Sequence, residues 1–116
     1  MTGWAGRPAI DIAAAVRSGQ VTAAQVVAWH LDRNAEVNPE LGAFARVRPA
    51  EAAREAAEVD ARAARADLPL AGVPVAIRDA IPVAGEPMRL GGSVAPTTAR
   101  EKDHPVVARL REAARS

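Results

Sequence analysis

An unbroken apolar run, "LPLAGVPVAI" at residues 68–77, constrains the fold more than any other feature of this chain. A strand with one side in solvent alternates apolar and polar residues, whereas a strand covered on both faces is apolar throughout. The run therefore predicts a buried strand, residues 70–79, which needs strands beside it and helices over it. This strand ends in Arg78, whose guanidinium does not lose its proton in proteins.

The side chains available to cover such a strand are mostly small. The chain has 116 residues, 49% of them hydrophobic, but much of that share is alanine, and the aromatic residues are only Trp4, Trp29 and Phe44. Alanine removes little apolar surface from water, so we expect one small domain, residues 1–116, with a thin core. The two tryptophans are predicted to complete this core; anchoring a partner protein is the alternative.

Charge and cysteine content exclude several classes of function. The 15 Lys and Arg residues nearly balance the 14 Asp and Glu residues, and a net charge of +1 gives no electrostatic case for binding nucleic acid or an acidic membrane. The absence of cysteine rules out disulfides, a thiol nucleophile and thiolate metal ligands. His30 and His104 are not at ligand spacing, so we expect them to cap or pack, with no metal and no cofactor. Without a membrane span or a leader pattern, the expected location is cytoplasmic.

Two helices are predicted in the first third of the chain. The first begins at Pro8 and stops at Gly19, and between them Ile12 and Val16 have the apolar spacing of a helix. Thr22 and Gln25 have the spacing of a capping box and begin the second. It is expected to end before Asn38-Pro39, because the residue preceding proline avoids helical geometry. The pair forms a predicted helical hairpin over residues 8–38.

A strand and a helix are predicted next, over residues 42–67. The stretch "GAFARVR" alternates enough around Phe44 and Val47 to indicate a short strand. Pro49 then opens a helix from about Ala50 to Ala66, whose inner face is nearly all alanine.

An irregular loop and one more helix complete the expected elements. The loop covers residues 80–102 and is rich in proline and glycine. The helix covers residues 103–115, with Asp103 or His104 as its cap and with Val106, Val107 and Leu110 facing inward. The predicted fold class is α/β, a helical hairpin and an alanine-rich helix packed on a few strands.

Several segments, in this order, resemble the N-terminal part of the amidase signature family, the Ser-cisSer-Lys amidohydrolases. They are "AAAVRSGQVTAAQVVAWHLDRNAEVNPELGAF", "GVPVAIRD", "VAGEPMRLGGS" and "DHPVVARLREA". The resemblance covers nearly the whole chain, and several matches in register are far more specific than one. It implies a truncated N-terminal part of the amidase signature fold.

The resemblance also implies which catalytic group is altered. In the family, a lysine occupies the position of Arg78, ends the buried strand and acts through the cis-serine as the base for the nucleophilic serine. A guanidinium cannot replace it, because it stays charged and is bulkier and forked. The family's nucleophile and cis-serine lie downstream of the residues that match "VARLREAARS", so we expect no intact catalytic residue here. Ser93, in "LGGS", matches a loop serine, and Lys102 lies in a polar segment.

These observations leave two main hypotheses for function. The first is an inactive amidase-like protein with a protein-binding or scaffolding role. Its candidate interaction residues, or vestigial pocket, are Val75, Ile77, Arg78, Asp79 and Ser93. The alternative for the charged pair is that Arg78 and Asp79 simply pair with each other or with a neighbour. The second is one half of a split amidase or amidotransferase, which hydrolyses a carbon–nitrogen amide bond together with a partner chain. A plain truncation without a selected role is a third possibility.

The uncovered strand also predicts the kind of partner. A strand buried on both faces needs neighbours that this sequence does not obviously supply. We therefore expect a homo-oligomer, or a protein partner that completes the sheet.

Overall fold

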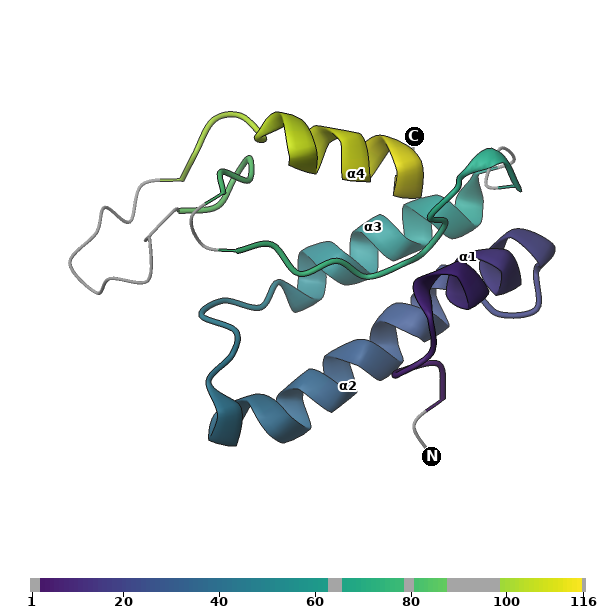
Figure 1. Ribbon diagram of the computed structural model, residues 1–116, viewed down its shortest axis with the longest axis horizontal. Coiled ribbons are helices and arrows are strands. Elements are labelled where there is room, and N and C mark those ends of the chain that lie inside the picture. Colours follow the sequence, from purple (N-terminus) through teal and green to yellow (C-terminus); the bar gives the residue numbers. More distant parts are fainter. Residues whose placement is uncertain (1–2, 63–65, 79–80, 88–98, 116) are drawn as a thin grey trace. The chain divides into compact units, whose positions relative to one another are not determined.

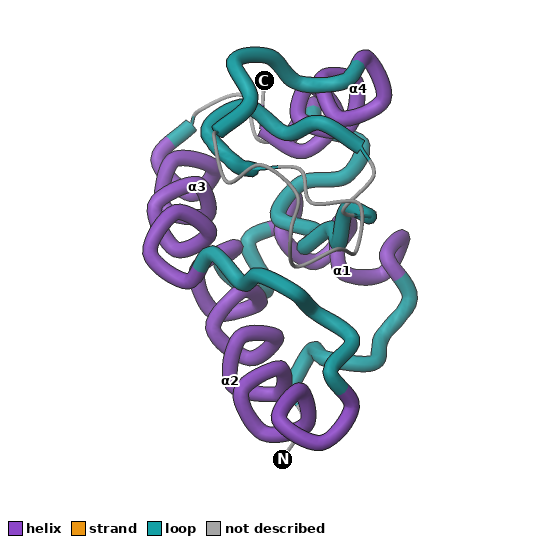
Figure 2. The backbone as a smooth tube through the Cα atoms, turned by 90° about the vertical axis from the view of Figure 1, so that its left-hand side faces the viewer, coloured by secondary structure: helices purple, strands orange, loops and turns teal. Residues whose placement is uncertain are grey.

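The computed structural model describes residues 3–62, 66–78, 81–87 and 99–115. Within them lie the helices α1 (Ala9–Ser18), α2 (Ala23–Leu41), α3 (Pro49–Ala61) and α4 (Pro105–Arg115) (Figure 1). These described residues contain no strand, only isolated bridges that join Ala84 to Arg100 and Pro87 to Ala99 (Figure 2). The chain divides into two compact units. Unit 1 comprises residues 1–74 and 112–116, and unit 2 comprises residues 75–111.

Helix α1 forms where the sequence predicts it. It follows Pro8, whose fixed φ suits the start of a helix, and it ends at Gly19, which takes the left-handed conformation with φ 81°. Ile12 and Val16, four residues apart, are both buried.

The start of α2 confirms the predicted capping box. The Thr22 hydroxyl accepts a hydrogen bond from the Gln25 amide at 3.0 Å, and the Gln25 side chain accepts one from the Thr22 amide at 3.0 Å. Asp60 of α3 adds a cap of its own, because its carboxylate accepts from the amides of Ala23 at 2.7 Å and Ala24 at 3.0 Å. Side chains therefore satisfy the first amides of α2, which have no partner inside the helix.

The end of α2 corrects the sequence prediction. The helix continues through Asn38 and Pro39 to Leu41 and closes at Gly42, whose φ is 62° and whose amide donates to the Asn38 carbonyl at 2.7 Å. Proline costs a helix one hydrogen bond and some crowding against the preceding turn. Pro39 removes the hydrogen bond that an amide here would donate to the Ala35 carbonyl, and the helix ends at Leu41, shortly after it.

The strand predicted at residues 42–48 is wrong. The Asn38 side chain donates to the Phe44 carbonyl at 3.1 Å and accepts from the Phe44 amide at 2.9 Å. In a strand, the amide and carbonyl of Phe44 would form hydrogen bonds with a neighbouring strand. Here the Asn38 side chain forms both of these hydrogen bonds instead. Phe44 itself is 43% exposed. Helix α3 then begins at Pro49, as expected, but ends at Ala61, earlier than the predicted Ala66.

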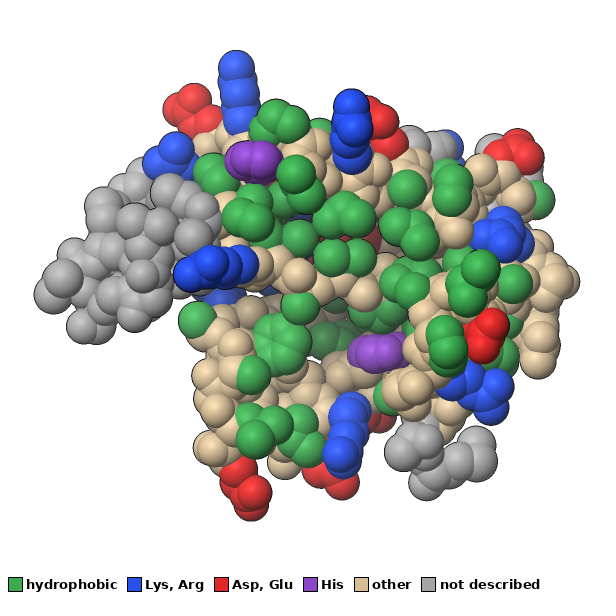
Figure 3. Space-filling model, in the orientation of Figure 1, with side chains coloured by type: hydrophobic (Ala, Val, Ile, Leu, Met, Phe, Trp, Pro, Cys, Tyr) green, Lys and Arg blue, Asp and Glu red, His purple; other side chains and the backbone are tan. Residues whose placement is uncertain are grey.

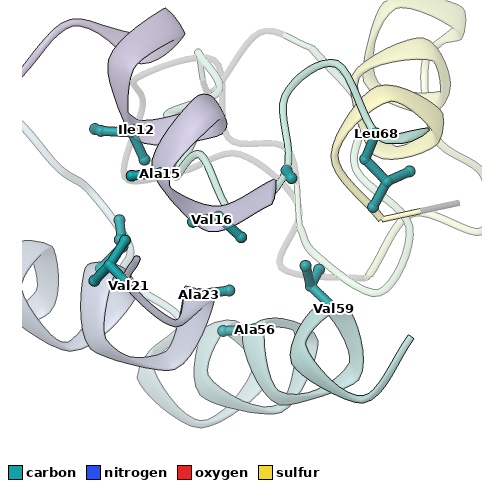
Figure 4. Packing of buried hydrophobic residues seen from close by; sticks show 10 residues of the cluster. Ile12, Ala15, Val16, Val21, Ala23, Ala56, Val59 and Leu68 are labelled. Atoms are coloured by element: carbon teal, nitrogen blue, oxygen red, sulfur yellow. The ribbon is translucent and has the colours of Figure 1, made fainter. Parts of the chain in front are cut away.

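The core of unit 1 is built from small side chains, as the composition predicts. It gathers residues from α1, α2, α3 and the turn that follows them (Figure 4). Its members are Ile12, Ala15, Val16, Val21, Ala23, Val26, Ala56, Val59, Leu68 and Ala71. The largest side chains that are fully buried are those of Val16 and Val26. Trp4 and Trp29 pack against this core from its edge, which agrees with a structural role for both.

Unit 2 is held mainly by hydrogen bonds between its loop segments. The Gly85 amide donates to the Arg100 carbonyl, the Arg100 amide to Glu86 and the His104 amide to Pro82, each at 2.9 Å. Helix α4 begins at Pro105, two residues later than predicted, and His104 is its cap, since its Nδ1 accepts from the Val106 amide at 3.0 Å.

The predicted inner face of α4 is only partly right. Val107 is buried at 3% exposure, and Leu110 is half-buried. Val106 is 50% exposed, so the expectation that it faces inward is wrong. Val107 and Arg111 share one side of α4 because they are spaced by four, and both side chains are largely buried.

Candidate functional site

The turn that leads into the candidate site is tied to α1 and to the last residues of α4, which belong to unit 1. The Arg17 guanidinium, in the last turn of α1, donates to the carbonyls of Leu68 at 3.3 Å and Pro69 at 3.0 Å. The Leu70 amide donates to the Ala113 carbonyl near the end of α4 at 2.9 Å. Both contacts satisfy backbone groups of a loop, and they fix where the following residues leave the core.

Gly72 lets this segment pass directly against α1 and α2. Its φ is 71°, a conformation that other residues rarely adopt. A β-carbon at this position would lie 3.0 Å from both the Ala23 β-carbon and a methyl of Val16. Glycine is thus required by backbone geometry and by space, and Val73 beside it packs against the core.

Residues 73–78, hereafter segment 73–78, are extended but do not form the predicted strand. Residues 69–72 are turns, and no backbone–backbone hydrogen bond joins residues 75–77 to any other described residue. A strand requires a neighbour to complete its ladder, and the described part of the chain offers none here. The α/β expectation is therefore supported only in its helical part.

The exposure of this segment differs from that of a buried strand. Val75 is 47% exposed, Ile77 is half-buried and Arg78 is exposed. The Arg78 carbonyl accepts a hydrogen bond from the Ile81 amide at 3.0 Å. An apolar extended segment thus ends in a solvated positive charge.

Two of the predicted site residues, Asp79 and Ser93, lie outside the described residues. Their relation to Arg78 stays a prediction. No ion pair joins Arg78 to another described residue, and Lys102 is exposed. Chemically, the described part of the site provides guanidinium donors and apolar surface, and it provides no group that accepts a proton at neutral pH.

Neither histidine takes part in a cluster of metal-ligand type. The His30 Nδ1 lies 2.8 Å from the Val26 carbonyl of its own helix, and His104 caps α4. Among the residues that the structure describes, no group of three or more His, Cys, Asp or Glu side chains is placed to hold a metal ion. No described helix has the length and apolarity needed to cross a membrane.

On the face shown in Figure 3, acidic and basic side chains lie scattered among apolar ones. Arg54 pairs with Glu58, four residues on, at 3.1 Å, but both side chains are more than half exposed. Exposed pairs of this kind contribute about 0–1 kcal/mol, so they solvate the surface more than they stabilise it.

Sequence reasoning missed Asp60, and it named Asp103 only as a possible cap of the last helix. Asp60 caps α2 from α3, and Asp103 accepts from the Ala84 amide at 2.7 Å while pairing with Arg111 at 2.9 Å. For Asp103 a signal existed, because Asp103, Val107 and Arg111 are spaced by four. For Asp60 no local signal exists, since its partners are 37 and 36 residues away.

Comparison with known proteins agrees with the order of the sequence segments. The family model described as Amidase matches residues 25–115. The A subunit of glutamyl-tRNA(Gln) amidotransferase from Renibacterium salmoninarum is 44% identical over 107 residues, which cover 90% of this chain and 21% of that protein. The subunit from Paenarthrobacter aurescens is 41% identical over 111 residues, with coverage of 90% and 21%. The one from Acidothermus cellulolyticus is 37% identical over 109 residues, with coverage of 92% and 22%.

The chain spans about a fifth of the length of these curated relatives. No solved structure matches it.

Proposed function

Because this chain belongs to the amidase family, we propose that it is a non-catalytic member that binds protein through segment 73–78. The observation that carries the proposal is the state of this segment. It is apolar and extended, its residues 75–77 have no backbone–backbone hydrogen bond to another described residue, and it ends in an exposed arginine.

The identity of residue 78 supports the non-catalytic part of the proposal. By resemblance, this position holds the family's lysine base. A lysine can be neutralised by burial and then accept a proton, whereas a guanidinium keeps its charge in any protein environment. Arg78 is also exposed. A mechanism that takes a proton at this position does not operate with this residue.

The backbone of the segment supports the binding part. An extended segment with unpaired amides and carbonyls is a template for an added strand, and such pairing gives affinity through the main chain and specificity through alternate side chains. Val75 is a large apolar side chain left half exposed, and burying it would add to the affinity. The partner is either a second copy of this chain or a chain that supplies the strands of an amidase sheet.

Light scattering on the purified chain and on the Val75→Asp variant tests this proposal. A second sample contains the chain co-expressed with the remaining part of the Renibacterium salmoninarum relative, the region outside the match. We expect an assembly in at least one of these samples, and we expect Val75→Asp to dissociate it, because a buried unpaired carboxylate is costly.

The matched control is Val106→Asp, since Val106 is also a valine of unit 2 and is 50% exposed. It should leave the assembly intact. A monomeric wild-type chain in both samples, or equal loss of assembly in both variants, would refute binding through segment 73–78.

A second candidate function is one half of a split amide-hydrolysing enzyme. The match of 90% of this chain to one continuous part of an amidotransferase subunit favours it. The test is ammonia release from glutamine by the co-expressed complex, with Arg78 and with Arg78→Lys. Under the first proposal the Arg78 complex is inactive and Arg78→Lys gains activity if the complementing chain supplies the remaining groups. Turnover with Arg78 in place would refute the non-catalytic assignment. The cytoplasmic location stays a prediction.

A further inference from the structure

The carboxylate of Asp103 contacts two segments of unit 2. One oxygen of its carboxylate accepts from the Ala84 amide at 2.7 Å, and the other lies 2.9 Å from the Nε of Arg111. The side chains of Asp103 and Arg111 are only 18% and 19% exposed. A single carboxylate therefore joins the loop at residues 81–87 to the middle of α4.

We infer that Asp103 is a clasp that keeps unit 2 closed, and that releasing it opens unit 2 while unit 1 stays folded. The clasp consists of Asp103, Ala84 and Arg111. The Ala84 amide donates a charge-assisted hydrogen bond to the carboxylate, and such bonds are stronger than neutral ones. Arg111 adds an ion pair of low exposure, although its Nε makes no hydrogen bond to another described residue.

Unit 2 depends on polar contacts because it buries little apolar surface. Among its described residues, Val107 is the only buried apolar side chain, and the other buried apolar residues of the structure all belong to unit 1. Its loops are joined by isolated bridges and not by a continuous ladder. Segments with few buried contacts open locally at a lower free energy than the core does. The clasp is then the main barrier to this opening.

The opening includes part of segment 73–78, because residues 75–78 are the first residues of unit 2. Release of the clasp frees these residues and the loop at residues 81–87 together, while Gly72 and the turn before it stay fixed on the core of unit 1. Hydrogen exchange measures this opening directly, whether or not the segment binds a partner.

Native-state hydrogen exchange, read by NMR on the full chain and on Asp103→Ala, tests the inference. The Ala84 amide loses its acceptor in this variant and would exchange faster in any case. The informative amides are those of Gly85, Arg100 and His104, whose acceptors are backbone carbonyls that the substitution leaves in place. We expect these three to exchange roughly tenfold faster or more. The Val26 amide of α2 should keep its rate.

Two further variants separate a clasp from a local acceptor. Asp103→Asn keeps an oxygen for Ala84 but removes the charge that pairs with Arg111, and Arg111→Met removes the cation alone. Both should accelerate the same three amides, less than Asp103→Ala does. Arg54→Ala, which breaks the exposed ion pair of α3, is the matched control and should accelerate none of them.

Three outcomes would overturn the inference. Faster exchange of Ala84 alone would make Asp103 a local acceptor. Equal acceleration of Val26 would show that the chain opens as one unit, and this outcome includes a variant that fails to fold. Unchanged exchange at Gly85, Arg100 and His104 would show that other contacts keep unit 2 closed.

Discussion

Replacing Asp60 with alanine removes both acceptors that cap α2 from α3. The two amides are affected differently. Ala23 is fully buried, so its amide has no water to replace the 2.7 Å hydrogen bond, whereas the hydrogen bond of Ala24 is exposed and water can take it over. An unsatisfied buried donor costs about 1–3 kcal/mol, and a lost cap about 0.5–2 kcal/mol. We therefore expect Asp60→Ala to lower the free energy of unfolding by about 2 kcal/mol.

Urea unfolding followed by tryptophan fluorescence measures this loss. Trp4 and Trp29 are the only tryptophans, and both pack against the core that the cap adjoins. The matched control is Glu58→Ala, an acid-to-alanine change two residues away on the same helix, which removes an exposed ion pair and should cost at most about 0.5 kcal/mol. The loss of unfolding free energy in Asp60→Asn should lie between these two values. The asparagine side chain keeps one acceptor oxygen for one backbone amide, but it turns an NH2 donor toward the other backbone amide.

The comparison of the two alanine variants tests whether the Asp60 carboxylate caps α2. If Asp60→Ala and Glu58→Ala lose the same free energy, the carboxylate does not hold α2 to α3 and the capping argument is refuted. A loss in Asp60→Ala that disappears at high salt would point instead to a solvated charge at the end of the helix dipole.

Three further changes have expected outcomes. Gly72→Ala should destabilise unit 1 by about 2 kcal/mol or more in urea unfolding, because its β-carbon meets Ala23 and Val16 and its φ is positive. Gly42→Ala, in the same unit, shares the positive φ but meets nothing within 4 Å, so in the same assay it should cost about 1 kcal/mol, and equal losses would contradict the packing argument. Thr22→Ala should cost about 1 kcal/mol through loss of the capping box, and a double variant with Gln25→Ala should add little. Asn38→Ala should speed hydrogen exchange of the Phe44 amide with little change in overall stability, and a rate that stays the same would mean that another acceptor protects it.

Features that rest on near neighbours in sequence were predictable. The capping box joins Thr22 to Gln25, three residues away, and the boundaries at Pro8, Gly19 and Pro49 follow from the restricted φ of proline and the free φ of glycine. Such signals hold in any tertiary context, because the groups involved meet as soon as the local backbone forms.

Features that depend on distant partners were not predictable. The predicted strands do not form, because a strand requires a neighbouring strand to complete its hydrogen bonds. At Phe44 the Asn38 side chain forms those hydrogen bonds instead. An apolar run shows that a segment prefers burial, but it does not show what buries it. For the same reason the exposure of Val75 and Arg78 at the candidate site did not follow from their pattern.

The small side chains of the core have a consequence for how stability varies with temperature. Unfolding changes the heat capacity in proportion to the apolar area that it exposes, typically about 12–15 cal/mol/K per residue. A core in which Val16 and Val26 are the largest fully buried side chains exposes less, so the change should fall below this range. A smaller heat-capacity change flattens the curve of unfolding free energy against temperature. Cooling and moderate warming should therefore each lower that free energy only a little, although its maximum is modest.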